Sequence, residues 1–234
     1  MIIRRTTDRL LFVNQPDHAA LAARIMAHWY ALRDHPRRDA ILTATENHDD
    51  GWREEDATLH VSDQGEPLDF IAVSAQVKQR IWPRAAERLS EARGPYVGAL
   101  VAQHALTVHA PLRDNPQWRR FFATMERTRD DLCRRAAAAD AAQFADDYAF
   151  VRTGDQLSLI FCNGWTAPLA GIGYRAILNG ITLEVTPDPF DGTRVPLSVH
   201  ARSLPARSYA SVDDLRAAVA EAPQIVLEGL ALGS

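Results

Sequence analysis

The spacing of apolar residues favours helices in the first two thirds of the chain. A short apolar run, Leu10 to Val13, comes first and predicts a strand within residues 2–13. Turn and stop residues then separate the helical segments, such as His35-Pro36 after the first and Gly51 after the second. Apolar residues recur at helical intervals over about residues 18–33, 38–49, 70–92, 96–108, 116–139 and 144–162.

Beyond residue 163 the pattern changes to an alternation of apolar and polar residues. Residues 181–185 and 195–199 alternate in this way and flank a turn at residues 188–192, which is typical of a β-hairpin. A helix at 212–221, capped by Ser211, and a strand at 225–230 are expected to follow. The prediction is a mainly α protein: a helical domain of residues 1–163 with a small, hairpin-rich α+β tail of residues 164–234.

Composition limits the classes of protein to consider. The chain has 234 residues, 47% hydrophobic and 24% charged, with a net charge of −4, which is typical of a soluble protein. The slight excess of acid argues against nucleic acid as the main partner. The apolar run near the N-terminus is too short for a signal peptide or a membrane span, so we expect no membrane association and a cytoplasmic location. Cys133 and Cys162 lack CxxC spacing and are expected to be free thiols.

The adjacent pair His48-Asp49 is the strongest local sign of chemistry. It ends a predicted helix and is followed by Asp50-Gly51-Trp52. An imidazole and a carboxylate at a helix end can both reach an ion beyond it, and the combination suits Zn, Mn or Fe(II). His18 lies on the preceding helix, which could run antiparallel and bring its ring to the same place. A solvated helix end, with His18 as a core histidine, is the alternative interpretation.

Two further residues on predicted helices could join this group. Asp155 lies in an otherwise apolar helix, where a carboxylate is costly to bury unless it is paired or binds a metal. An ion pair with Arg152 or with another of the many arginines would also explain it. His104 lies on the predicted face of the helix at 96–108, and a buried histidine bonded to backbone is the alternative there.

The order His18, then His48-Asp49, then Asp155 resembles the HD superfamily of metal-dependent phosphohydrolases. The resemblance implies an HD-like helical bundle in which these four side chains bind a divalent metal ion. Members with two ions carry extra histidines between the dyad and the last aspartate, and His104 is the candidate for that role.

A closer resemblance is to an uncharacterised bacterial family, a domain of unknown function of similar length. The shared pieces cover most of the chain in order. They are Gln15-Pro16-Asp17-His18, His48-Asp49-Asp50-Gly51-Trp52-Arg53, Gly65-Glu66-Pro67-Leu68-Asp69-Phe70, Pro95-Tyr96 running to His104, Asp155-Gln156-Leu157-Ser158-Leu159 ending at Cys162, and Pro187-Asp188-Pro189-Phe190. The resemblance to this family implies no particular activity.

The HD resemblance implies hydrolysis of a nucleotide or another small phosphoester. One or two divalent ions (Mn, Fe, Zn, Co or Mg) would lower the pKa of bound water, and the resulting hydroxide would attack phosphorus. Asp49 could accept a proton, and His104 could bind a second ion or protonate the leaving oxygen. Arg53 or Arg152 could neutralise the phosphate charge.

Two other function classes stay open. A di-iron oxygenase on the same fold would need extra His and Asp ligands and would give an iron-rich, coloured preparation. A ligand-binding or regulatory protein would keep the fold without turnover. The C-terminal tail has no residues suited to catalysis, and it could cover the site, support a homodimer or stabilise the helical domain.

Overall fold

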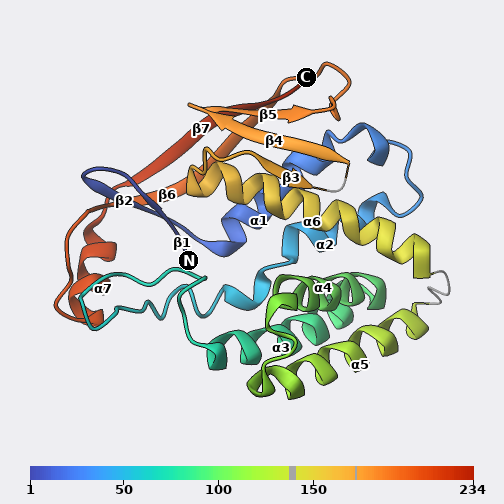
Figure 1. Ribbon diagram of the computed structural model, residues 1–234, viewed down its shortest axis with the longest axis horizontal. Coiled ribbons are helices and arrows are strands. Elements are labelled where there is room, and N and C mark those ends of the chain that lie inside the picture. The colour runs from blue at the N-terminus through green and yellow to red at the C-terminus, as the bar shows by residue number, and fades with distance from the viewer. Residues whose placement is uncertain (137–140, 172) are drawn as a thin grey trace.

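A seven-stranded mixed sheet lies across one side of the molecule (Figure 1). The computed structural model describes residues 1–136, 141–171 and 173–234. Adjacent strands are antiparallel except β5 and β7, which are parallel. The strand order is β1 (Ile2–Arg5), β2 (Arg9–Val13), β6 (Val195–Pro205), β7 (Gln224–Gly233), β5 (Thr182–Thr186), β4 (Tyr174–Asn179) and β3 (Leu169–Gly171). The prediction of a mainly α, HD-like bundle is therefore wrong, because this is an α/β protein.

The N-terminal strands explain the error. Leu10 on β2 pairs with Leu204 on β6, so the sheet takes strands from both sides of residue 163. A local pattern reveals a strand but not a partner that lies far along the chain. Residues 10–13 are apolar without alternation because both faces of β2 are covered: Leu11 and Val13 face one core, and Leu10 and Phe12 face another.

The predicted helices are present, with shifted ends. One of them, α3, begins after Ser74, whose hydroxyl accepts from the amide of Val77, and it continues through Pro83 without a break. Residues 137–139 of the segment predicted at 116–139 lie outside the described residues. The helices are α1 (Gln15–Ala27), α2 (Arg38–Asn47), α3 (Ala75–Arg93), α4 (Pro95–Val108), α5 (Arg119–Arg135), α6 (Ala141–Asn163) and α7 (Val212–Glu221), with 3-10 turns η1 (Tyr30–Leu32), η2 (Asp50–Trp52), η3 (Ala110–Leu112) and η4 (Pro116–Trp118).

Two apolar cores meet along the helices in the middle of the molecule. One face of the sheet packs on α1 and α6, around residues such as Ile25 and Phe161. The second core lies among α2 to α6 and includes Trp82, Leu100 and Met125. Figure 1 shows α1 and α6 beside the sheet, with α3, α4 and α5 on the opposite side of the molecule. Within the part of the chain that the structure describes, no helix has the length and apolar character needed to cross a membrane.

Candidate metal centre

Five ionisable side chains converge where α1, α2, α4 and α6 meet. His18 lies in the first half of α1, His48 ends α2, and Asp49 follows before η2. His104 comes from α4 and Asp155 from α6. Each of these residues is buried, with at most 6% of its surface exposed. The structure therefore brings together all the residues that the sequence suggested as metal ligands.

Small residues allow the surrounding helices to approach closely enough for this convergence. Gly154 precedes Asp155 on α6, and a Cβ atom there would lie 2.7 Å from Cγ of Met26 and 2.9 Å from Cγ2 of Thr45. A larger residue would push α6 away from α1 and α2. Gly51 is similar, because its Cβ would lie 3.0 Å from the carbonyl oxygen of Ile81 on α3. The two glycines thus set the position of the dyad and of Asp155.

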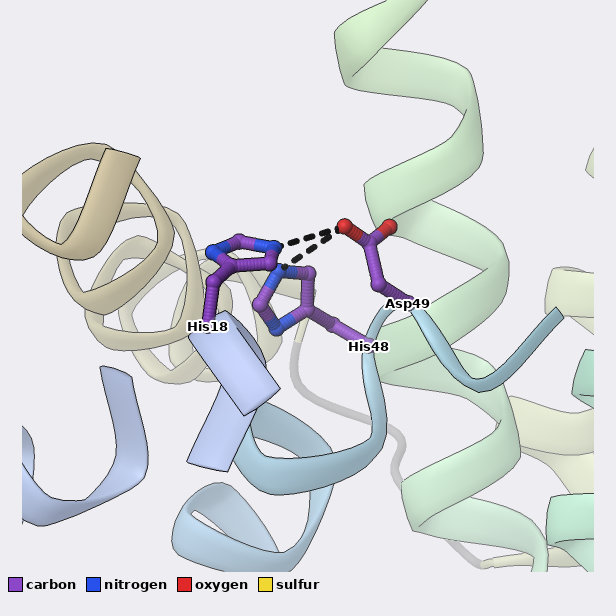
Figure 2. Close-up of side chains that lie close together, drawn as sticks. All are labelled: His18, His48 and Asp49. Carbon is purple, nitrogen blue, oxygen red and sulfur yellow. Dashed lines mark hydrogen bonds and ion pairs between the residues drawn. The ribbon is translucent and has the colours of Figure 1, made fainter. Parts of the chain in front are cut away.

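The imidazole nitrogens and carboxylate oxygens face one another across short distances. Figure 2 shows the rings of His18 and His48 pointing toward one oxygen of Asp49. That oxygen, Oδ2, lies 2.8 Å from Nε2 of His18 and 3.7 Å from Nε2 of His48. Oδ1 of Asp155 lies 3.3 Å from Nε2 of His48, and its Oδ2 lies 4.0 Å from Nε2 of His104. Nε2 of His48 thus faces both carboxylates.

Neighbouring groups determine which ring nitrogen carries the proton in two of the histidines. Nδ1 of His48 lies 2.6 Å from the carbonyl oxygen of Thr45, which can only accept, so Nδ1 donates. The hydroxyl of Ser158 donates to the carbonyl of Asp155, so its oxygen accepts from Nδ1 of His18 at 2.9 Å. In the neutral form both rings therefore present an unprotonated Nε2 to carboxylate oxygens.

A divalent cation fits this arrangement. Two lone pairs that face carboxylates repel them unless a proton or a cation lies between. Nε2 of His48 is buried and has no hydrogen-bond partner among the described residues. Tetrahedral zinc with bonds of 2.0–2.1 Å separates its ligand atoms by about 3.3 Å, and the ligand atoms of His18, His48 and Asp49 lie within 4.8 Å of one another. The Nδ1 hydrogen bonds are the type that usually orients metal-binding histidines.

Burial and the nearby charges of both signs determine the pKa values of the cluster residues. Burial alone would lower the pKa of His48, but the carboxylates of Asp49 and Asp155 outweigh it and raise the pKa to about 9. Burial would raise the pKa of Asp49, yet the imidazoles of His48 and His18 beside it hold that pKa below its usual range. Burial, together with the charge of His48, lowers the pKa of His104 to about 4. Without a bound cation, the centre thus holds a proton on His48.

The two predicted phosphate-binding arginines lie outside this cluster. Arg53 is exposed and donates from Nε to Asp50 at 3.1 Å. Arg152 is half-buried on α6 and, within the described residues, makes no hydrogen bond or ion pair with the cluster. Asp155 pairs with His48 rather than with Arg152, so the ion-pair alternative for Asp155 is wrong.

No role was predicted for Gln15, although it begins the shared segment Gln15-Pro16-Asp17-His18. Gln15 lies one turn before His18 on α1 and is fully buried. Its backbone amide donates to Oδ2 of Asp56 at 2.6 Å, but both polar atoms of its side chain lack a partner among the described residues. Ser158 was also missed, and its i, i+3 spacing from Asp155 is the signal that could have identified it.

Comparisons with known proteins identify a family and no individual relative. No curated protein and no solved structure matches the chain. A family model described as a protein of unknown function, DUF3891, matches residues 1–206. This match confirms the resemblance to an uncharacterised family. The chain therefore belongs to the DUF3891 family.

Proposed function

We propose that this protein is a metal-dependent phosphohydrolase that acts on a nucleotide or another small phosphoester. The observation that carries the proposal is that the Nε2 atoms of His18 and His48, whose Nδ1 atoms are hydrogen-bonded to other groups, face the carboxylates of Asp49 and Asp155. This donor set suits Zn, Mn, Fe or Co. The order of the four ligands along the chain also resembles the HD superfamily, and that resemblance is part of the proposal.

In this proposal His18, His48, Asp49 and Asp155 hold the ion. The ion would supply Lewis acidity and would lower the pKa of a water molecule toward neutrality. The pKa values of both aspartates are held below their usual range by the histidines, despite burial, so the carboxylates stay ionised. The carboxylate of Asp49 would also accept a proton from the attacking water.

His104 is best suited to hold Asp155 or a second ion. Its Nε2 lies beside Oδ2 of Asp155, and its Nδ1 lies 3.4 Å from the hydroxyl of Tyr148. With a pKa of about 4 it is neutral near pH 7, which favours a ligand over a proton donor. His48, His104 and Asp155 form a second potential ligand group. One lone pair on Nε2 of His48 can serve only one ion, so a second ion would need ligands from water or substrate.

The degree of burial favours a second candidate function, a closed metal site without turnover. The side chains of Asp49 and Asp155 are only 9% and 8% exposed, and those of His18 and His48 are fully buried. Structural metal sites are closed, whereas catalytic sites keep a position open for water or substrate. A chain that binds metal and is stabilised by it, but hydrolyses no phosphoester, would fit this candidate.

A screen of phosphoesters with Mn, Co, Zn and Mg tests the proposal. We expect hydrolysis by the wild-type chain and a loss of at least a thousandfold in His48→Gln and Asp155→Asn, as for removal of a group essential to the chemistry. The control is His109→Asn, which changes a buried histidine that stacks on Trp118 and is not one of the five cluster residues. Activity that survives in the two ligand variants would contradict the proposal.

A further inference from the structure

A cavity of about 450 Å³ lies beside helix α7. Its wall is formed by the β2–α1 junction, the segment after η2, strand β6 and helix α7. None of the five cluster residues is among its lining residues, but two lining residues lie close to them in the chain: Asp17 precedes His18, and Arg53 follows Asp49 by four residues. The volume lies within the range of about 300–1,000 Å³ found for small-molecule sites.

The wall combines basic groups with apolar surface. Arg53, Arg202 and Arg216 line it together with the apolar side chains of Phe12, Leu59 and Val219. The lining acids number two, Asp17 and Asp56, so the arginines are in excess.

Both lining acids are already engaged elsewhere. Asp17 accepts a hydrogen bond from the side chain of Asn14 at 2.9 Å, and Asp56 accepts one from the amide of Gln15. Arg202 donates from Nη1 to the carbonyls of Val219 and Ala222, which fixes its guanidinium against the C-terminal end of α7.

Arg53 and Arg216 are the adaptable cations. Arg53 uses only its Nε, toward Asp50, and Arg216 pairs through Nη1 with the exposed Asp213. Their side chains are 66% and 54% exposed, so their own ion pairs are weak and can be exchanged for a ligand. A guanidinium fork matches the oxygens of a phosphate group.

We propose that this cavity binds a small phosphorylated molecule that has an apolar body. The phosphate contacts Arg53 and Arg216, and the apolar part packs against Phe12, Leu59 and Val219. That this molecule is also the substrate of the metal centre rests on the proposed function, whereas binding itself does not.

Titration with phenylphosphonate tests the proposal, because this probe carries a phenyl ring and a group that no phosphohydrolase can remove as phosphate. The protein is used as purified and again after treatment with a chelator. We expect saturable binding by calorimetry in both states, with amide shifts at Ala57 and Val219 in NMR spectra. Arg53→Gln and Arg216→Gln should each weaken binding by about tenfold, as for loss of one charge-assisted hydrogen bond. The matched control is Arg120→Gln, which removes an exposed arginine on α5.

Three outcomes would overturn the proposal. They are no saturable binding at millimolar probe, equal affinity in the two cavity variants and the wild type, and equal affinity for the neutral analogue benzyl alcohol. Binding that vanishes with the chelator and ignores the arginines would assign the probe to the metal centre and also reject the cavity. Binding in the cavity by a chain that holds no metal would instead leave the cavity site standing and reject the proposed function.

Discussion

Two buried polar clusters in this protein differ in whether they are complete by themselves. In the first, the fully buried carboxylate of Asp147 accepts from Nε and Nη2 of Arg37 and from the hydroxyl of Tyr96, with His35 at 3.4 Å. The acid therefore has a permanent cation as its partner. In the metal centre two carboxylates meet only imidazoles, and Nε2 of His48 is left without a hydrogen bond among the described residues.

This difference is the one expected between a structural ion pair and the binding site that we propose. A buried acid paired with arginine needs nothing else, because guanidinium stays charged at every pH of interest. A group of aspartates and histidines can exchange a proton for a metal ion, since both compete for the same lone pairs. The comparison thus predicts that changes in the Asp147 cluster affect stability alone, whereas changes in the metal centre affect metal content.

The largest effect on stability should come from Asp147→Ala. The change leaves the partly buried Arg37 and the hydroxyl of Tyr96 without their acceptor, and removal of one partner of a buried ion pair costs about 4 kcal/mol. Urea unfolding measures the loss, with Asp131→Ala on the exposed face of α5 as a control near zero. Metal content per folded chain should not change. A loss of metal content in Asp147→Ala would contradict the distinction between the two clusters.

Acid should reveal a buried histidine, His109, that makes no ion pair within the described residues. Burial lowers the pKa of His109 from 6.5 to about 4, whereas the two aspartates raise that of His48. As the pH falls below 6.5 the unfolded chain takes up a proton at His109 that the folded chain refuses until about pH 4. Stability is therefore full above pH 6.5 and falls toward pH 4, by at most about 3 kcal/mol from this group.

The contribution of His109 is obtained by comparing the wild type with His109→Asn. The amide of asparagine can still donate to the carbonyl of Ala105, as Nδ1 of His109 does at 2.9 Å. Unfolding by urea is measured between pH 7 and pH 4, with chelator present in all samples so that metal does not contribute. The variant should lose less stability than the wild type over this range. Parallel curves for the two chains would contradict the assignment of a lowered pKa to His109.

Removal of metal should lower the free energy of unfolding through the metal centre and not through the Asp147 cluster. If the free ion is at a hundred times its dissociation constant, chelation costs the folded wild-type chain about 2.7 kcal/mol. Asp147→Ala should show the same sensitivity to chelator, because its change lies outside the metal centre. Asp155→Asn should show none. Thermal unfolding with and without EDTA measures this difference, and a wild-type midpoint that ignores EDTA would count against a bound ion.

The smallest effect is expected at Gln15, where a substitution should raise the free energy of unfolding. Both polar atoms of its side chain are buried without a partner in the described structure, so Gln15→Met replaces an unsatisfied amide with an apolar group of similar shape. We expect the free energy of unfolding to rise by about 1 kcal/mol. If the amide contacts substrate or water at the centre, hydrolysis should fall at the same time. A loss of stability would mean that the amide is satisfied in solution.

The residues of the candidate site were easier to predict from the sequence than the fold was. His18, Asp155 and the dyad were identified by residue type and order, because a carboxylate in an apolar helix requires a partner whatever the fold. The positions of most helices followed from their periodicity. The helix α1 begins after its N-cap Asn14, and Pro16 occupies its first turn.

Long-range pairing accounts for most of what was missed. The pairing of β2 with β6 and the parallel contact between β5 and β7 leave no local signature. The same holds for the surroundings of Glu55, which no local pattern indicates. It is buried between His60 and Arg80, which come from a loop and from α3. Candidate residues can thus be proposed from sequence, whereas their partners require the fold.

Elemental analysis of the purified chain, after loading with Zn, Mn, Fe or Co and removal of excess ion, tests the central claim most directly. We expect at least one tightly held divalent ion per chain in the wild type and in Asp147→Ala, and none in His48→Gln or Asp155→Asn. A wild-type chain that retains no ion under any of these conditions would contradict it, as would ligand variants that retain as much as the wild type.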